Sequence, residues 1–394
     1  MKLKRTILLL AIAGFVLGGI LSGCTGNSTG GSKKTVIKIA SQSPLSGGSA
    51  TLGEAIKLGA QLAIDDQKKD FAKKGFTIQL DAVDDMGDPK KGVANAQQLV
   101  ADKSVLAVVG HLNSGVAIPS SEVYEKNNLP MVSPGTTATE VTDRGLKTVN
   151  RICARDDFQG PAGANYAVKT LKAKKIFIIQ DKTAYGSGLA EQFRKQAKKL
   201  GAKIVGYEGI TVGEKDFNGV ISHAVAKKPD LIYFGGVYAE GGLIIKQARE
   251  KGLNIPIMGG DGLDSSSTVS IAGDAVKGAY LTSVAGDVTK TEKGRAFAKK
   301  YKQKFNKNIE SYSAYGYDSA AVILEGLKKA IDDNDGKLPT REQVETAIRG
   351  VKDYDGVTTK VSFNNKGDNK YAKVYIYNFE EQKYPPAQKA EISQ

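Results

Sequence analysis

The order of apolar and amphipathic segments is the feature that most restricts how this chain can fold. From residue 35 to residue 284, short apolar runs of strand length alternate with longer segments of helical character. The first such segment, Gly53–Lys69, carries Ile56, Ala60 and Ile64 at helical spacing. Regular alternation of strands with helices predicts right-handed βαβ units and a parallel sheet covered on both faces.

The alternation forms two series of about five strands each, so two doubly wound, Rossmann-like lobes are expected in an α/β chain of 394 residues. Residues typical of helix ends support this alternation. Asp88-Pro89 is typical of the start of a helix, and Gly252 is typical of the end of one. Three consecutive helices (291–305, 313–331 and 340–349) and a hairpin-like stretch (357–379) follow. The predicted lobes are 35–155 with 284–357 and 156–283 with 358–394, joined by a hinge.

The first residues indicate export. A basic start, an apolar core (Ile7–Ile20) and two small residues form a signal rather than a spanning helix. The run Leu21-Ser22-Gly23-Cys24 looks like a bacterial lipobox, which implies cleavage after residue 23 and lipidation of Cys24. A Gly/Ser/Thr-rich tether, 24–34, then follows, and such segments behave as flexible coil. The alternative is an ordinary secretory signal with an incidental cysteine.

Charge and cysteine content restrict the partners. The net charge is +14, of which three charges belong to the signal. The lysines read as scattered over helix surfaces, without a basic stripe interleaved with aromatics, so nucleic-acid binding is not expected. A solvated surface, favourable beside anionic lipid or wall polymer, is the better interpretation. Cys153 lacks a disulfide partner once Cys24 is lipidated, and it is expected as a buried small hydrophobe.

Enzyme and metal motifs are missing from the sequence. The G-x-S-x-G pattern occurs only at residues 26–30, within the Gly/Ser/Thr-rich tether and not in the strand–turn–helix context of a nucleophile elbow. No H-E-x-x-H, C-x-x-C or P-loop pattern occurs. His223 is expected at the surface, and His111 is expected to orient a loop rather than act as a base. Gly186-Ser187-Gly188 is only half of a dinucleotide fingerprint. We therefore expect no enzymatic activity, no metal and no cofactor.

Two strand ends place donors at one sheet edge. The run ending at Gly110 leads to Ser114 at a helix start, and the strand 130–132 leads to Gly135, Thr136 and Thr137. The first N–H groups of a helix lack intrahelical partners and carry the positive end of its dipole. This edge is therefore expected to bind a small anion such as a carboxylate.

A second edge offers complementary groups. Tyr185, Tyr238 and Asp261 each follow a predicted strand of the second series, where a doubly wound sheet forms its crevice. Asp261 alone would be interpreted as a turn residue. However, the first edge offers hydroxyl and N–H donors, and the second edge, which faces it, offers a carboxylate and aromatic side chains that suit an ammonium group. A zwitterionic α-amino acid fits between the two edges.

Several motifs in order resemble the branched-chain amino-acid-binding proteins of bacterial ABC importers, which have the type I periplasmic-binding-protein fold. The resemblance spans about residues 35–380 and rests on these stretches: IASQSPLSG, DDMGDPKKGV, VVGHLNSG, MVSPGTTATEVTDRG, QDKTAYGSGLA, GITVGEKDF and IMGGDGL. It implies a monomeric, membrane-anchored extracytoplasmic protein that closes on its ligand and docks on a permease.

The resemblance also implies residue roles. Ser114, Thr137 and the Gly135 backbone would bind the ligand carboxylate, with Thr136 beside them. Asp261 and Tyr185 would bind the ammonium group, while the pocket around Leu52 and Tyr238 would contact the ligand side chain. The family usually has Glu at the position of Asp261 and often an aromatic at Leu52. Leu, Ile and Val are expected as ligands; the alternative is a sensor or binding protein of the same fold for another amino acid or a short amide.

Overall fold

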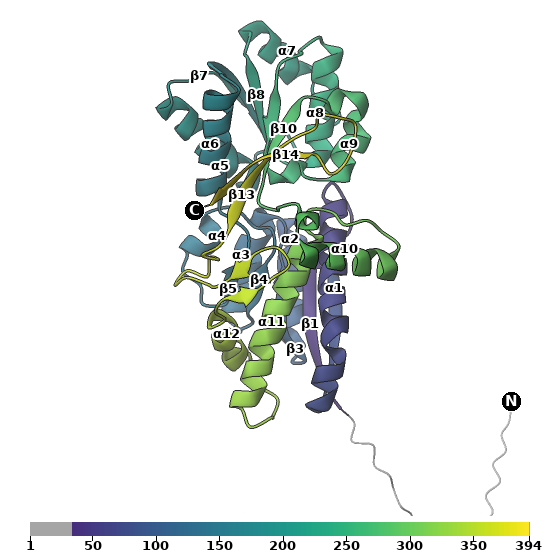
Figure 1. The fold of residues 1–394 in the computed structure, drawn as a ribbon. Coiled ribbons are helices and arrows are strands. Elements are labelled where there is room, and N and C mark those ends of the chain that lie inside the picture. The colour runs from purple at the N-terminus through teal and green to yellow at the C-terminus, as the bar shows by residue number, and fades with distance from the viewer. Residues whose placement is uncertain (1–33, 394) are drawn as a thin grey trace, which may run out of the picture. The chain divides into compact units, whose positions relative to one another are not determined.

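The computed structural model describes residues 34–393, so the predicted signal, Cys24 and most of the tether lie outside the described residues. Two sheets with helices on their faces make up the described chain, as Figure 1 shows. We call the parts built on these sheets lobe 1 and lobe 2. No helix among residues 34–393 is long and apolar enough to cross a membrane.

Lobe 1 contains a fully parallel five-stranded sheet in the order β2-β1-β3-β4-β5. Its central strand β3 (Val105–Gly110) is buried along its whole length, as a parallel strand covered on both faces should be. The other strands are β1 (Thr35–Ser43), β2 (Phe76–Asp84), β4 (Met131–Ser133) and β5 (Val149–Arg151). The covering helices are α1 (Ala50–Lys73), α2 (Pro89–Ala101), α3 (Ser114–Glu125), α4 (Glu140–Asp143), α10 (Glu292–Phe305), α11 (Ser313–Asp333) and α12 (Arg341–Arg349).

Lobe 2 contains a seven-stranded sheet in the order β14-β13-β10-β9-β8-β6-β7. Five strands are parallel, and the last two along the chain are antiparallel to their neighbours. The strands are β6 (Lys175–Gln180), β7 (Lys203–Gly209), β8 (Leu231–Gly235), β9 (Ile257–Gly259), β10 (Ala279–Ser283), β13 (Lys373–Asn378) and β14 (Ala387–Ser393). The helices are α5 (Asp156–Asn165), continued by a π-helical turn, α6 (Ala184–Lys199), α7 (Asn218–Lys227), α8 (Tyr238–Glu250) and α9 (Ser266–Ala272).

The expected α/β fold is confirmed. Asp88 caps α2 by accepting a bond from the Lys91 N–H at 2.8 Å, and Gly252 follows α8 with a φ of 79°. The three consecutive helices also occur, as α10, α11 and α12, within two residues of the predicted limits.

The predicted hairpin differs from the structure. Around the Asn365-Lys366-Gly367 turn only one bridge forms, between Phe363 and Asn369, and two-residue strands β11 (Tyr354–Asp355) and β12 (Lys360–Val361) precede it. The longer strand β13 pairs instead with β10 and with β14. Burial explains the choice, because five of its six residues are buried in the lobe 2 sheet. The limits of the two lobes along the chain stay a prediction.

Both sheets reverse their strand order at one point, between β1 and β3 in lobe 1 and between β6 and β8 in lobe 2. Ligands of doubly wound sheets bind outside the carboxyl ends of strands at such switch points. The loops that leave β3, β6 and β8 lead to helices α3, α6 and α8. The first turns of these helices contain Ser114, Tyr185 and Tyr238, respectively. The fold thus positions three of the predicted site residues.

Helices α1 and α11 pack closely enough to require glycine at the contact. A Cβ atom on Gly59 would lie 2.0 Å from the Ser313 carbonyl oxygen, and one on Gly316 would lie 2.4 Å from that of Ile56. Because both neighbours are backbone atoms, they cannot move aside independently. These helices cover the lobe 1 sheet, and their packing depends on these two positions.

We expect Gly59→Ala to destabilise the protein by about 1–3 kcal/mol, because the added methyl group overpacks a backbone contact. Gly219→Ala in α7 is the matched control, since nothing lies within 4 Å of the added atom. The control should be neutral or stabilise by up to about 1 kcal/mol. Chemical denaturation of both variants measures the difference, and equal stability of the two would contradict the described packing.

Candidate functional site

The lobe 1 edge of the site is formed where α3 begins. Ser114 is buried at the start of α3, and its Oγ accepts a bond from the Ala138 N–H at 3.2 Å. Thr137 is buried as well, yet its Oγ1 has no hydrogen-bond partner among the described residues. No described acceptor binds the N–H groups of Ser114 and Thr137. Buried polar groups without partners are rare, and they indicate space for a ligand or water.

The two residues before Thr137 are engaged within the loop. The Gly135 and Thr136 N–H groups donate to Ser133 Oγ at 3.2 and 2.9 Å, and Thr136 Oγ1 donates to the same atom at 2.6 Å. This arrangement folds the loop after β4 so that Thr137 faces the edge. A ligand contact by Gly135 or Thr136 stays a prediction.

The lobe 2 edge is organised around Asp261. This residue follows β9, and its Oδ1 accepts bonds from Tyr185 OH and from Gln159 Nε2, both at 2.8 Å. Tyr185 OH in turn accepts the Gly262 N–H at 2.9 Å. Burial raises the pKa of the Asp261 carboxyl, although these donors and Tyr312 oppose the shift.

Two hydrogen bonds join the edges across the cleft. Tyr312 OH, at the start of α11 in lobe 1, donates to Asp261 Oδ2 at 2.5 Å. Tyr238 OH, at the start of α8 in lobe 2, accepts the N–H of Thr51 at 3.0 Å. The structure therefore brings Asp261 and Tyr185 together and places Tyr238 at the contact between the lobes. Such contacts are available only when the lobes are closed.

The sequence analysis missed Asp156. It is the first residue of α5, is 1 % exposed, and lacks a hydrogen-bond partner on either carboxylate oxygen. Its N–H donates to the Thr137 carbonyl oxygen at 2.8 Å, which places it beside the lobe 1 edge. Burial, and then the nearby Asp261 carboxylate, raise the pKa of Asp156 to about 8. The nearby Thr137 hydroxyl and Arg151 guanidinium oppose this shift in the pKa of Asp156. Neither Asp156 nor Asp261 forms an ion pair with a described cation, since Arg151 pairs with Asp368, and a ligand ammonium would supply the missing partner.

Gln159 and Tyr312 were also missed. Gln159 Nε2 bonds to Asp261 and to Thr282 Oγ1, while its Oε1 has no partner. The only sequence signal for Asp156 and Gln159 is their position after the crossover from lobe 1, at a helix start. Tyr312 gave no signal, because it lies about fifty residues beyond Asp261 and meets it only through the fold.

Apolar side chains from both lobes line the same region. Leu52 (1 % exposed) and Leu112 from lobe 1 belong to one cluster with Tyr238 (5 % exposed) from lobe 2 and with Tyr312. Thr51, the residue before Leu52, donates its N–H to Tyr238 OH, so these two segments meet between the lobes. Contact of Leu52 and Tyr238 with a ligand side chain stays a prediction. Cys153 lies in this cluster, buried and free, which confirms the prediction of a small core residue.

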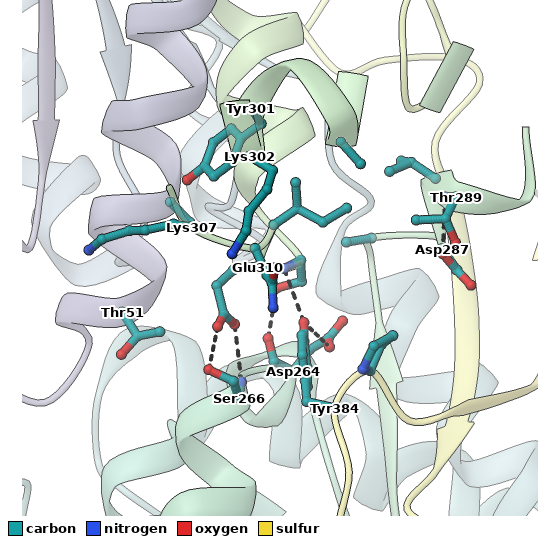
Figure 2. Close-up of a pocket in the computed structure, with 18 of the residues that line it drawn as sticks. Thr51, Asp264, Ser266, Asp287, Thr289, Tyr301, Lys302, Lys307, Glu310 and Tyr384 are labelled. Carbon is teal, nitrogen blue, oxygen red and sulfur yellow. Dashed lines mark hydrogen bonds between the residues drawn. The ribbon is translucent and has the colours of Figure 1, made fainter. Parts of the chain in front are cut away.

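A cavity of about 640 Å³ lies beside this region and is lined from both lobes (Figure 2). Its carboxylates are partnered, unlike that of Asp156: Glu310 accepts from the Ser266 N–H at 3.1 Å, and Asp264 accepts from Tyr384 OH at 3.1 Å. Burial raises the pKa of both acids, that of Asp264 to about 7. These bonds tie the cavity walls together, and they leave no unpaired buried side-chain atom there for a ligand.

The two histidines of the described chain differ in their surroundings. His111 is buried against Tyr124 and Asp85, whereas the side chain of His223 is 67 % exposed, as predicted. Within residues 34–393 no group of three or more His, Cys, Asp or Glu side chains is arranged to bind a metal ion.

Comparisons with known proteins identify the family of this chain. The model of the periplasmic binding protein family matches residues 36–383. The Leu/Ile/Val-binding protein BraC3 of Rhizobium johnstonii is 36 % identical over 337 residues, which cover 86 % of this chain and 90 % of that protein.

Solved structures are similar over nearly the whole length. The leucine-binding protein LivK of Thermotoga maritima has a TM-score of 0.83 at 29 % identity, covering 90 % of this chain and 98 % of LivK. The branched-chain amino-acid transporter substrate-binding protein LivJ of Streptococcus pneumoniae, in complex with isoleucine, has a TM-score of 0.81 at 28 % identity, with coverage of 92 % and 99 %. The chain therefore belongs to the periplasmic binding protein family and has its type I fold.

Proposed function

We propose that this protein is the lipid-anchored binding component of an ABC importer and captures Leu, Ile or Val between its closing lobes. The observation that most supports this function is the buried pair Asp156 and Asp261, with an unpartnered Thr137 hydroxyl beside Asp156. The site is incomplete in a way that a zwitterion corrects, because it offers acceptors for an ammonium and donors for a carboxylate.

The ligand carboxylate would bind at the start of α3. The N–H groups of Ser114 and Thr137, with the Thr137 hydroxyl, are unengaged among the described residues, and the helix dipole favours an anion there. Hydrogen bonds to a charged group in a dry cleft are stronger than neutral ones. This end of the ligand would therefore contact lobe 1.

The ligand ammonium would bind between the two acids. An ionised carboxylate offers about four acceptor positions, and Asp261 already uses three, for Tyr185, Gln159 and Tyr312. One position is left on Asp261, whereas all positions of Asp156 are unused. We therefore assign the larger share of the ammonium contact to Asp156, with Tyr185 orienting Asp261.

The apolar cluster around Leu52 and Tyr238 would accept the ligand side chain. The relatives named for Leu, Ile and Val support branched aliphatic ligands. One methylene in an apolar pocket changes affinity only by about 1–3 kcal/mol, so all three ligands are expected to bind. Closure would shield the charges from water and present the closed form, as a monomer, to permease subunits.

Asp261→Asn and Asp156→Asn should each weaken leucine binding by about 10–100-fold, because each removes a charge-assisted hydrogen bond worth about 1.5–3 kcal/mol. Asp157→Asn is the matched control, since this neighbour of Asp156 is an exposed partner of Arg155. Calorimetric titration with L-leucine measures all three. Unchanged affinity in both site variants would refute the proposed ammonium site.

Leucine affinity should rise with pH up to about 8 and then level off. Burial raises the pKa of Asp156 to about 8, so the empty site holds a proton at lower pH that the ammonium must displace. The stability of the ligand-free protein should change in the opposite sense. The folded state binds more protons than the unfolded state between about pH 4 and pH 8, so its stability falls over this range as the pH rises.

Asp156→Asn should remove the part of both effects that comes from Asp156. The stability gained by the ligand-free variant over the parent chain should therefore be larger at pH 8 than at pH 5, because only at the higher pH does the parent bury an ionised Asp156. Thermal unfolding and leucine titration at several pH values measure them. A leucine affinity that is independent of pH between 5 and 8 would contradict this account of the site.

The anchor is proposed from the sequence, because Cys24 lies outside the described residues. Cys24→Ser should abolish incorporation of labelled fatty acid and release the protein from membranes into the soluble fraction. Leucine binding should be unchanged, because the site lies wholly within residues 34–393. Membrane retention of the variant without label would show an uncleaved signal instead of a lipid anchor.

A further inference from the structure

Lysines gather at the edge of the lobe 2 sheet that faces away from the cleft. The sequence analysis interpreted several of them as scattered, but the strand register brings them together. Residues Lys175 of β6 and Lys203 of β7 are direct neighbours, and Leu231, the first residue of β8, lies beside Ile176. Helices α6 and α7 end at the same edge, at Lys199 and Lys227. We call the following nine exposed residues the lysine edge: Lys169, Lys172, Lys174, Lys175, Lys198, Lys199, Lys203, Lys227 and Lys228.

The lysine edge is unpaired. In the described part of the chain, none of its nine side chains forms an ion pair. Asp230 lies among them, but its carboxylate accepts the backbone N–H groups of Lys174 and Lys175 at 2.9–3.1 Å. The nine positive charges therefore raise the local electrostatic potential, and Asp230 is the acid among them that offsets part of it.

The corresponding edge of lobe 1 is different. There, lysines at the ends of α1 and α11 pair with neighbouring acids, so both signs alternate. The pairs are Lys73 with Asp70, Lys74 with Asp332, and Lys329 with Asp333. The accumulation of one sign is thus a property of lobe 2 and not of a Lys-rich surface in general.

Helix capping explains only part of the lysine edge. Lys198, Lys199 and Lys227 lie in last turns of helices, where a cation interacts favourably with the helix dipole. Other members, such as Lys174, Lys175 and Lys203, lie at strand starts or in the loop before a strand, where no helix end requires them. Like charges on adjacent strands also repel each other, so this arrangement costs stability in the absence of a partner.

We propose that the lysine edge binds a linear polyanion whose backbone carries phosphodiester groups. Neighbouring strands lie about 4.8 Å apart, so Lys203 and Lys175 at the starts of β7 and β6 are adjacent along the sheet edge, and Lys227 and Lys228 at the end of α7 precede the next strand, β8. A row of this kind fits a polymer with regularly spaced charges better than a single small anion. Lysine ammonium groups bind phosphate as compact point charges without demanding one fixed geometry.

The position of the lysine edge favours a polymer over the anchoring bilayer as its partner. The carboxyl ends of both sheets face each other through the Tyr312–Asp261 and Thr51–Tyr238 bonds. The opposite ends, which carry the start of β1 and the lysine edge, therefore face away from each other. The described chain begins at Lys34, directly before β1, so an anchor upstream of it would join lobe 1 at the end remote from the lysine edge. The choice of a polymer over a bilayer depends on the proposed lipid anchor. The clustering of the lysines does not depend on it.

The test uses the mature chain and a synthetic poly(glycerol phosphate), with phosphatidylglycerol vesicles as a second probe. The triple variant Lys175→Gln, Lys203→Gln and Lys227→Gln should bind the polymer about tenfold more weakly or worse, and added salt should weaken binding of the parent chain. Fluorescence anisotropy of labelled polymer measures this binding. Leucine titration of the same variant should give the parent affinity, which shows that the cleft and the fold are intact.

The matched control removes the same charge from lobe 1, as Lys73→Gln, Lys329→Gln and Lys337→Gln, and it should bind the polymer as the parent does. An equal loss in both variants would overturn the proposal, because net charge alone would then explain the binding. Tighter binding to vesicles than to the polymer at equal phosphate concentration would also overturn it. If the parent chain itself did not bind leucine, the proposed transport function would be contradicted, while the result with the polymer would still stand.

Discussion

Two carboxyl groups buried in a closed cleft without a cation are the constraint on which the account of this protein depends. Asp156 and Asp261 are each less than 5 % exposed, and both have raised pKa values because burial penalises their ionised forms. Elsewhere in this fold, buried acids that join segments accept bonds from neutral donors, as Asp264 does from Ser283 and Tyr384. Here Asp261 has three neutral donors and Asp156 has none. In the proposed function, this arrangement would lower the stability of the empty protein and raise its affinity for an ammonium group.

The fold explains how such a site can form. Each sheet has one switch point, where adjacent loops leave in opposite directions and expose helix starts. Lobe 1 uses its switch point to present hydroxyl and N–H donors, and lobe 2 uses its own to present Asp261 and Tyr185. Asp156 lies where the chain crosses from one lobe to the other, so its position depends on how the lobes are arranged. In the proposed function, ligand binding and lobe closure would therefore be coupled through Asp156.

Much of this could be predicted from local patterns. The strand and helix alternation, the Asp88 cap and the three consecutive helices depend on residues close in sequence, and all are present in the structure. Asp156, Gln159 and Tyr312 could not be identified in this way, because their roles arise from contacts between distant segments. The pairing of β13 with β10 was missed for the same reason. The lysines of lobe 2 were interpreted as dispersed because their adjacency follows from strand register, which the sequence does not display.

The most direct test of the central claim compares L-leucine with 4-methylpentanoate, which has the same side chain and carboxylate but lacks the ammonium group. The protein is first unfolded and refolded to remove bound ligand, and each compound is then titrated by calorimetry. If the two buried acids bind the ammonium, leucine binds at a single site and 4-methylpentanoate binds at least about 100-fold more weakly, or not at all. Equal affinity for both compounds would show that the acids serve another purpose and would contradict the account.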